Sequence, residues 1–394
     1  MTPSRQQIRS ETALARGRYG AFIHSCLDGG TSARLTPRAD PSAFALCFAI
    51  FGLQLVGDHV CLRTHGPEWA AALRRAVRQT AQRRSAAVDL ASDKHFLQLL
   101  TFCLSSLAVL DRLADDPMPD MVTPLLMADV PGALSRSGVD RGVARSGNHA
   151  MFIAILLIHA RQNLGLDTDA AIADWVRCHR GWMNRFGFWG PDDSMSHLQF
   201  QNGYHQYEIL EYLGEHGDYW EQAADAVASL ADEEGHFAPY PGGGGCYDYD
   251  AVFLLTASEG IARRHERLLA RTAATLLAEQ NVDGGFAESL RIRPRSLDNL
   301  RRSWRHVQGA RGQARLERLR QALTLLRPRH DRIETHWSHY SRGWGESDLW
   351  DSWFRMLALA RIERALEPES SQRWGFIDFP GIGFHPCVRA PGQS

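Results

Sequence analysis

The feature that most constrains the fold of this sequence is a landmark of glycine and an aromatic residue that recurs in its second half. It occurs as RFGFWGP around Trp189, EEGHFAPYP around Phe237, NVDGGFAES around Phe286 and SRGWGESD around Trp344. These aromatic residues are 48, 49 and 58 positions apart. Each landmark follows a helical pattern, and at least three precede another one. A helix, a glycine turn and a second helix, repeated about every fifty residues, predict stacked helical hairpins.

Helical patterns also fill the first half of the chain, and runs that alternate β-branched and polar residues are almost absent. This predicts an all-α protein of about a dozen helices. The second helices of the hairpins are apolar nearly all round, as in AVFLLTA (251–257) and WFRMLALA (353–360). Such helices suit an inner ring that outer helices surround. We therefore predict an α/α toroid, a barrel of paired inner and outer helices.

We expect one toroid domain over residues 1–394, in which 1–40 is a partly irregular N-terminal segment and 367–394 is a C-terminal tail. Forty-four basic residues balance 45 acidic ones, which argues against a nucleic-acid partner. The longest apolar run, 150–160, is too short to span a membrane. The N-terminus shows no secretory pattern, and seven cysteines are scattered without a CxxC pair. These features predict a cytoplasmic protein.

One segment resembles a known repeat. LLAEQNVDGGFAES is similar to the glutamine–aromatic repeat of the terpenoid cyclase and protein prenyltransferase superfamily, through Gln280, Gly284, Gly285 and Phe286. The resemblance implies the α/α-toroid fold. The same fold carries unrelated chemistries, including polysaccharide lyases and unsaturated-uronide hydrolases, so it does not by itself define an activity.

The stretch GGGGCYDYDAVFLL (242–255) resembles two motifs of that superfamily. Class II terpenoid cyclases carry a D-x-D-D box whose middle aspartate protonates an alkene, and DYDA supplies Asp248 and Asp250 but ends in Ala251. Prenyltransferases carry a zinc-binding D-x-C-Y motif, of which GGCY keeps Cys246 and the tyrosine but has glycine in place of the aspartate. The resemblance implies an acid at this position and weakens the case for a prenyltransferase-type zinc site.

Physical chemistry gives two interpretations of the two aspartates. One acid at a helix start is explained by capping, which contributes about 1 kcal/mol. A second acid two residues later is not needed for capping and could transfer a proton, if burial or a nearby negative charge keeps it protonated. We predict that the helix begins near Tyr247, that Asp248 caps it, and that Asp250 faces a cavity as the proton donor.

In a toroid the inner helices all begin at one end of the central cavity. We therefore expect His205, Asp248, Asp250 and Asp348 to converge there as catalytic residues. The predicted substrate-binding residues around them are His197, Gln201, Tyr249, His336, His339, Trp344, Glu346 and Asp351. An H-x-x-H spacing would place His336 and His339 on one helical face, and with Cys246 they are the candidate metal ligands. No cofactor is favoured, and zinc or magnesium is left open.

Three functions are compatible with this pattern. The first is acid-initiated cyclisation or isomerisation at a central cavity, by an enzyme of the terpenoid-cyclase-like class. The alternative is a carbohydrate-active toroid of the lyase, epimerase or hydrolase type, since many of the expected site residues are polar. The second alternative is a non-catalytic interaction scaffold. The expected partner is a small-molecule or saccharide substrate, and the sequence does not set the oligomeric state.

Overall fold

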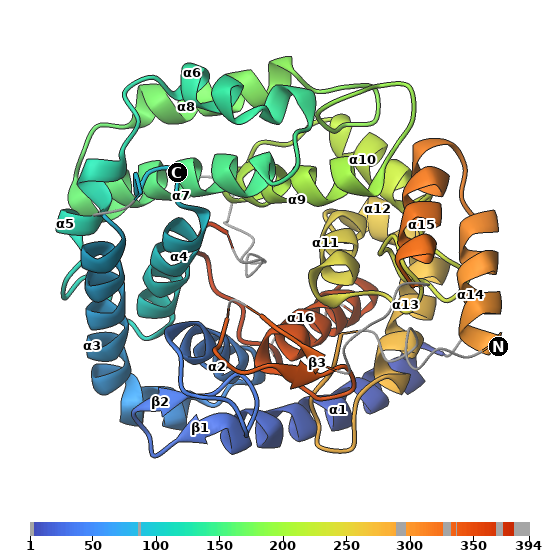
Figure 1. The fold of residues 1–394 in the computed structure, drawn as a ribbon, viewed down its shortest axis with the longest axis horizontal. Helices are drawn as coiled ribbons and strands as arrows, with labels where there is room; N and C mark the ends of the chain where they lie inside the picture. Colours follow the sequence, from blue (N-terminus) through green and yellow to red (C-terminus); the bar gives the residue numbers. More distant parts are fainter. Residues whose placement is uncertain are drawn as a thin grey trace.

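The computed structural model describes residues 4–85, 88–288, 297–325, 332–335, 337–367 and 373–381. Figure 1 shows a ring of helices in two layers around a central axis. Six helices form the inner layer: α2 (Ala43–Val56), α4 (Lys94–Val109), α7 (Ser146–Leu164), α9 (His197–Tyr212), α11 (Gly245–Leu255) and α16 (Leu349–Leu366). Each inner helix contacts the next, and α16 contacts α2, so the inner ring is closed.

Outer helices pack around this ring (Figure 1). They are α1 (Arg5–Cys26), α3 (His59–Arg84), α6 (Val130–Ser137), α8 (Asp169–Gly181), α10 (Tyr219–Ala228) and α13 (Glu266–Ala278). Shorter or more peripheral elements are α5 (Pro119–Val122), α12 (Glu259–Arg264), α14 (Leu297–Gln308), α15 (Gly312–Leu325) and the 3-10 helices η1 (Thr123–Leu125) and η2 (Val139–Arg141). The described residues thus contain sixteen α-helices, more than the dozen expected, because several are short.

The few strands in the described residues form two small antiparallel hairpins. One pairs β1 (Leu27–Asp28) with β2 (Ser32–Ala33), and the other pairs β3 (Arg332–Ile333) with β4 (Arg342–Gly343). His339 lies between β3 and β4 in a described stretch without helix, whereas His336 lies outside the described residues. That the two histidines share a helical face therefore stays a prediction.

The sequence explains the two layers. Almost every residue of α2 is buried, because both its ring-facing and outward-facing sides pack against other helices. The outer α8 instead buries one stripe, which includes Ile172, Trp175 and Cys178. Inner helices also begin at well-defined caps. Ser42 caps α2, and Ser196 caps α9 in a reciprocal capping box with Gln199.

Gln280 explains why its landmark motif suits this fold. Its side-chain amide donates hydrogen bonds to the Ala15 carbonyl on α1, at 2.9 Å, and to the Gly284 carbonyl, at 2.8 Å. Gly284 has φ +90°, and a Cβ there would lie 2.2 Å from the Arg18 carbonyl oxygen. The glutamine and glycine together therefore fasten the end of α13 to α1.

Both chain ends pack against the ring of helices. Most of the N-terminal segment up to residue 40 forms the long helix α1, which packs against α16. In the described part of the C-terminal tail, 373–381, the Trp374 indole donates to Glu363 on α16 at 2.9 Å. The Gly375 amide donates to the Leu55 carbonyl at the end of α2, at 3.1 Å. This segment therefore crosses the ends of two inner helices. Among the described helices, none is both long and apolar enough to cross a bilayer.

Candidate active site

The beginnings of four inner helices lie close together. Charges on Lys94, at the start of α4, and Arg145, which precedes α7, affect each other. Lys94 also interacts electrostatically with Cys246 in the first turn of α11, and Cys246 with Asp351 in the first turn of α16. The strongest concentration of buried ionisable groups lies where α9, α11 and α16 meet, and we take this region as the candidate active site.

Asp250, in the second turn of α11, is the acid of this region whose negative charge has the fewest hydrogen-bond donors and cations around it. Its side chain is fully buried, and neither carboxyl oxygen has a hydrogen-bond partner of ordinary geometry among the described residues. Burial raises its pKa well above the ordinary value, and the charge of Glu208 on α9 raises it further. The Cys246 thiol, one turn earlier, favours the ionised form, but with a smaller effect. Burial and the charge of Glu208 therefore both favour the protonated form of Asp250.

Glu208 links this acid to His205 and Asn148. The buried Glu208 Oε2 lies 3.8 Å from His205 Nδ1. His205 Nε2 lies 2.7 Å from the amide nitrogen of Asn148 on α7. Because an amide nitrogen only donates, Nε2 accepts this bond, and a neutral ring carries its proton on Nδ1, toward Glu208. Three inner helices thus contribute a polar row that runs from Asn148 to Asp250.

Asp248 faces the opposite way, into an ionic network. Its Oδ1 accepts a hydrogen bond from the Phe237 backbone amide at 2.9 Å, and its Oδ2 lies 3.8 Å from Arg355 Nη1 on α16. The same Arg355 nitrogen lies 2.6 Å from Glu279. Helix α11 begins at Gly245, after Gly244, and has no side-chain cap. The prediction that Asp248 caps the helix is therefore wrong, and the helix begins two residues before Tyr247.

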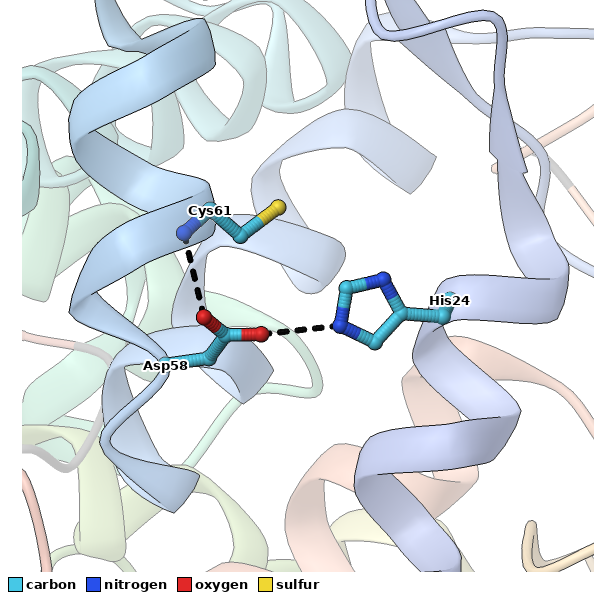
Figure 2. Close-up of side chains that lie close together, drawn as sticks. All are labelled: His24, Asp58 and Cys61. Carbon is cyan, nitrogen blue, oxygen red and sulfur yellow. Dashed lines mark hydrogen bonds and ion pairs between the residues drawn. The ribbon is translucent and has the colours of Figure 1, made fainter.

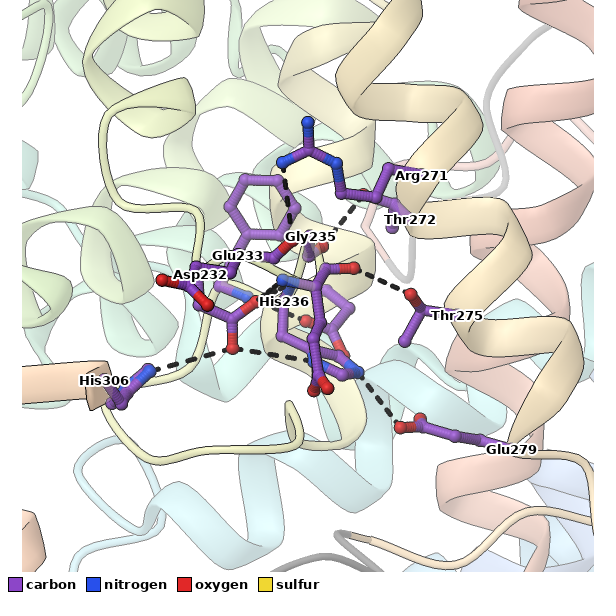
Figure 3. A network of polar contacts seen from close by, with 12 residues as sticks. Asp232, Glu233, Gly235, His236, Arg271, Thr272, Thr275, Glu279 and His306 are labelled. Atoms are coloured by element: carbon purple, nitrogen blue, oxygen red, sulfur yellow. Dashed lines mark hydrogen bonds and ion pairs between the residues drawn. The ribbon is translucent and has the colours of Figure 1, made fainter. Parts of the chain in front are cut away.

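His236 extends this network (Figure 3). Its Nε2 lies 3.2 Å from Glu279, and its Nδ1 lies 3.6 Å from Asp232, which also lies 3.7 Å from His306. Burial alone would lower the pKa of His236, but hydrogen bonds to Asp232 and Glu279 outweigh it and raise the pKa to about 10. The imidazole is therefore protonated at neutral pH, and it joins Arg355 in opposing the negative charge of the three acids. Asp232 and His236 form a group with Glu234 whose spacing could hold a metal, but here they pair with each other.

The glycine run 242–245 lets the backbone approach these groups. Gly243 has φ +71°, and a Cβ there would lie 2.2 Å from Asp248 Oδ2 and 2.6 Å from the His236 ring. A Cβ at Gly244 would lie 2.0 Å from the hydroxyl oxygen of Tyr240. A side chain at either position would therefore displace these groups, so glycine is needed for the backbone to pack against them.

Asp348 and Asp351 share one arginine. Asp348 is the N-cap of α16 and accepts the Asp351 amide hydrogen at 2.8 Å. Arg342, from β4, lies 2.5 Å from Asp348 and 2.7 Å from Asp351. Burial raises the pKa of Asp348, and the Arg342 charge opposes that rise. Both predicted residues lie at the start of α16, where their carboxyl groups form ion pairs with Arg342.

The other predicted residues have varied positions. Tyr249 is fully buried and packs its ring against Tyr204 at 5.9 Å between centroids. Gln201 is half-buried. Glu346 accepts hydrogen bonds from the Tyr340 hydroxyl at 3.1 Å and the Gly343 amide at 2.9 Å, within its own hairpin.

Two histidines and a tryptophan complete the set. His197 lies apart from Asp250: its ring is buried between the Phe237 carbonyl, at 3.0 Å, and Arg318, at 3.4 Å. Burial lowers its pKa to about 3. His339 is exposed and Trp344 half-buried in the hairpin, whereas His336 lies outside the described residues. Cys246 and His339 belong to neither group of metal-ligating side chains found in the described chain.

Sequence reasoning missed Glu208, Glu279 and Arg355, which complete the two buried clusters. A signal for Glu208 was present. It follows His205 by three residues on a helix whose other faces are buried, so it points into the protein with the histidine. Glu279 and Arg355 carried no such signal, since their contacts join residues 76 positions apart.

The closed double ring of helices defines an α/α toroid, as predicted. No protein-family model and no curated protein sequence matches this chain. Among solved structures, it is similar to a glycosidase bound to glucose, with 13% identity, 92% of this chain and 99% of that chain covered, and a TM-score of 0.50. It is also similar to the type II terpene cyclase MstE from Scytonema, with 13% identity, 94% and 100% coverage, and a TM-score of 0.49. At such identities the likeness shows the fold alone.

Proposed function

We propose that this protein is an enzyme that begins the cyclisation or isomerisation of an isoprenoid-like substrate by protonating it. Asp250 is the general acid. The observation that carries the proposal is its fully buried carboxyl group, without ordinary hydrogen-bond partners and with a pKa raised by burial and by Glu208. An alkene is a weak base, so its protonation requires an acid that is neutral and poorly solvated before it reacts.

The proposed step moves one proton. The alkene π electrons form a new C–H bond with the Asp250 proton, which leaves a carbocation on the substrate and a carboxylate on the enzyme. Loss of a proton from the rearranged cation ends the reaction, and Asp250 recovers a proton before the next cycle. The row of Glu208, His205 and Asn148 leads from Asp250 toward half-buried side chains, so it offers a route for that recovery.

A continuous series of aromatic rings supports a cationic intermediate. Tyr249 packs against Phe354 at 5.6 Å, Phe354 against Trp350 at 4.5 Å, and Trp350 against Trp337 at 4.4 Å between centroids. Trp350 is half-buried, and the Tyr249 pKa responds to the charge of Asp250. Aromatic faces stabilise a nearby cation by about 0.5–2 kcal/mol each. An acid beside such a series is what proton-initiated cyclisation requires.

In the free protein, substrate does not reach Asp250 without a local movement, because the carboxyl group is fully buried. Cys246 and Tyr247, one turn earlier on the same helix, are half-buried and lie nearer to solvent. We propose that an apolar substrate displaces one of these side chains and excludes water as it enters.

The carbohydrate-active alternative has one specific observation in its favour. Two buried carboxyl groups, Glu208 and Asp250, interact beside polar side chains of His205 and Asn148. Glycosidases use such a pair as acid and base or nucleophile. The aromatic series near Asp250 favours the cyclase.

The test combines binding with catalysis. A tertiary-amine analogue of farnesol, protonated at neutral pH, mimics the carbocation. We expect it to raise the melting temperature of the protein more than farnesol or maltotriose does, and Trp350→Ala to reduce this difference. With farnesyl and geranylgeranyl compounds as substrates, Asp250→Asn should lower turnover about 10²–10⁴-fold without lowering the melting temperature. Asp248→Asn, which keeps the acceptor for Phe237, should retain more activity. Stabilisation by maltotriose alone, or full activity of Asp250→Asn, would reject the proposal.

A further inference from the structure

A second cluster of reactive side chains lies on the outside of the ring (Figure 2). His24 comes from the last turn of α1, Asp58 caps α3, and Cys61 lies in the first turn of α3. His24 Nε2 lies 2.8 Å from Asp58 Oδ2, and Asp58 Oδ1 accepts the Cys61 amide hydrogen at 3.0 Å. One imidazole nitrogen, one carboxylate oxygen and the thiol sulfur all lie within 4.8 Å of one another.

We propose that His24, Asp58 and Cys61 bind one Zn²⁺ ion. Imidazole nitrogen, carboxylate oxygen and thiolate sulfur are the three protein ligands that zinc prefers. With ordinary zinc–ligand distances and tetrahedral angles, the nitrogen and oxygen would be about 3.3 Å apart, and the nitrogen and sulfur about 3.5 Å. Zinc would therefore enter after the His24–Asp58 hydrogen bond opens by roughly half an ångström and the sulfur turns inward.

His65 is the candidate fourth ligand. It follows Cys61 by four residues on α3, so both side chains leave the same face of the helix, and it lines the same surface pocket as the other three. Its ring stacks on Trp69 at 5.3 Å, and the turn at Gly30, with φ +82°, packs so closely that a Cβ there would lie 2.7 Å from the ring. Packing thus holds the imidazole in the same pocket, but it lies outside the group whose ligand atoms are within 4.8 Å of one another, so it would have to turn toward the ion to bind it.

The burial of the cluster suits an ion that enters from solvent and is then enclosed. The His24 and Asp58 side chains are 50% and 30% exposed, whereas Cys61 is 9% exposed. Four protein ligands would leave no open position, so the site would be structural. It would clamp the end of α1 to the start of α3, across elements that are otherwise joined here by one hydrogen bond between side chains.

Cobalt substitution tests the site directly, because thiolate-bound Co²⁺ shows a charge-transfer absorption band. We expect the full-length protein, stripped with a chelator, to bind one equivalent of Co²⁺ with this band, and Zn²⁺ to displace it. Cys61→Ser should abolish the band. His65→Ala should weaken Co²⁺ binding at least tenfold and change the d–d spectrum to that of a site with a bound water. Cys246→Ser, which alters the half-buried cysteine on α11, should leave the titration unchanged.

His24→Gln keeps the experiment decisive if Cys61→Ser does not fold, since His24 is half exposed and its loss leaves α3 capped. It should weaken Co²⁺ binding at least tenfold with the far-ultraviolet circular dichroism unchanged. The proposal is overturned if the wild-type protein shows no thiolate band, if the band survives in Cys61→Ser, or if His24→Gln binds Co²⁺ as tightly as wild type.

Discussion

Two buried acidic regions at the start of the inner helices differ in how their charge is compensated. Asp248 has an amide donor, a buried arginine and, through Glu279, a protonated histidine. Asp250, two residues later on the same helix, has two oxygens without ordinary partners and a negative neighbour in Glu208. Burial raises the pKa of both aspartates, but the charges of His236 and Arg355 and the Phe237 amide oppose that rise at Asp248. At Asp250 the charge of Glu208 adds to the rise. Two acids in one helical turn thus differ in how far the protein compensates their negative charge.

The largest loss of stability is expected when the ion pairs of Asp248 and Glu279 with Arg355 are removed. Arg355→Leu would remove the buried cation that faces both Asp248 and Glu279 and leave them only His236, which should lower the free energy of unfolding by about 3–5 kcal/mol. Chemical denaturation measures this change. The matched control is Arg177→Leu on the outer α8, where the solvent-exposed pair with Asp174 should contribute little to stability because water screens it. Equal effects of the two substitutions would show that the Arg355 network is not what stabilises this region.

A substitution in the glycine run tests how much the close approach of Gly243 to Asp248 contributes to stability. Gly243→Ala forces a Cβ toward Asp248 and adds strain at φ +71°. We expect a loss of about 2–3 kcal/mol, most of it from displaced contacts. Gly29→Ala is the control, because Gly29 has φ +59° but no atom within 4 Å of the added Cβ. It should cost only the backbone strain, about 1 kcal/mol. If both variants lose the same stability, the close approach to Asp248 contributes nothing.

A smaller effect, on the pH dependence of activity, is expected when Glu208 beside Asp250 is changed. Glu208→Gln removes the charge that adds to the effect of burial on the pKa of Asp250, so the basic limb of the pH–activity profile should move to lower pH. Burial would still keep the acid above its ordinary pKa. Glu215→Gln, beyond the end of α9 and paired with Arg180 at the surface, should leave the limb in place. An unchanged limb in Glu208→Gln would mean that burial alone sets this pKa.

The fold could be predicted because its determinants are local and repeated. Glycine turns with an aromatic residue, and inner helices that are apolar all round, are visible in short windows of sequence. The placement of acids at inner-helix starts follows from the same topology. The orientation of Asp248 could not be predicted, because its partners Phe237 and Arg355 come from a preceding loop and from α16.

The contrast also predicts how stability depends on pH. Asp250 has a folded-state pKa above its unfolded value of about 4. Between these two values the folded state holds a proton that the unfolded state has lost, so this group makes stability fall as pH rises through that window. Asp250→Asn should remove this slope and be at least as stable as wild type at pH 7, as measured by denaturation at several pH values. A steeper fall in the variant would contradict the raised pKa.

The central claim is that Asp250 is a neutral carboxylic acid in the folded protein at neutral pH. Infrared difference spectroscopy between wild type and Asp250→Asn measures this directly, since a protonated carboxyl group has a carbonyl stretching band that a carboxylate lacks. The account predicts a carboxylic-acid band at pH 7 that is present in wild type, absent from Asp250→Asn and retained in Asp248→Asn. A wild-type band that appears only below about pH 4, the ordinary range of an aspartate, would contradict it.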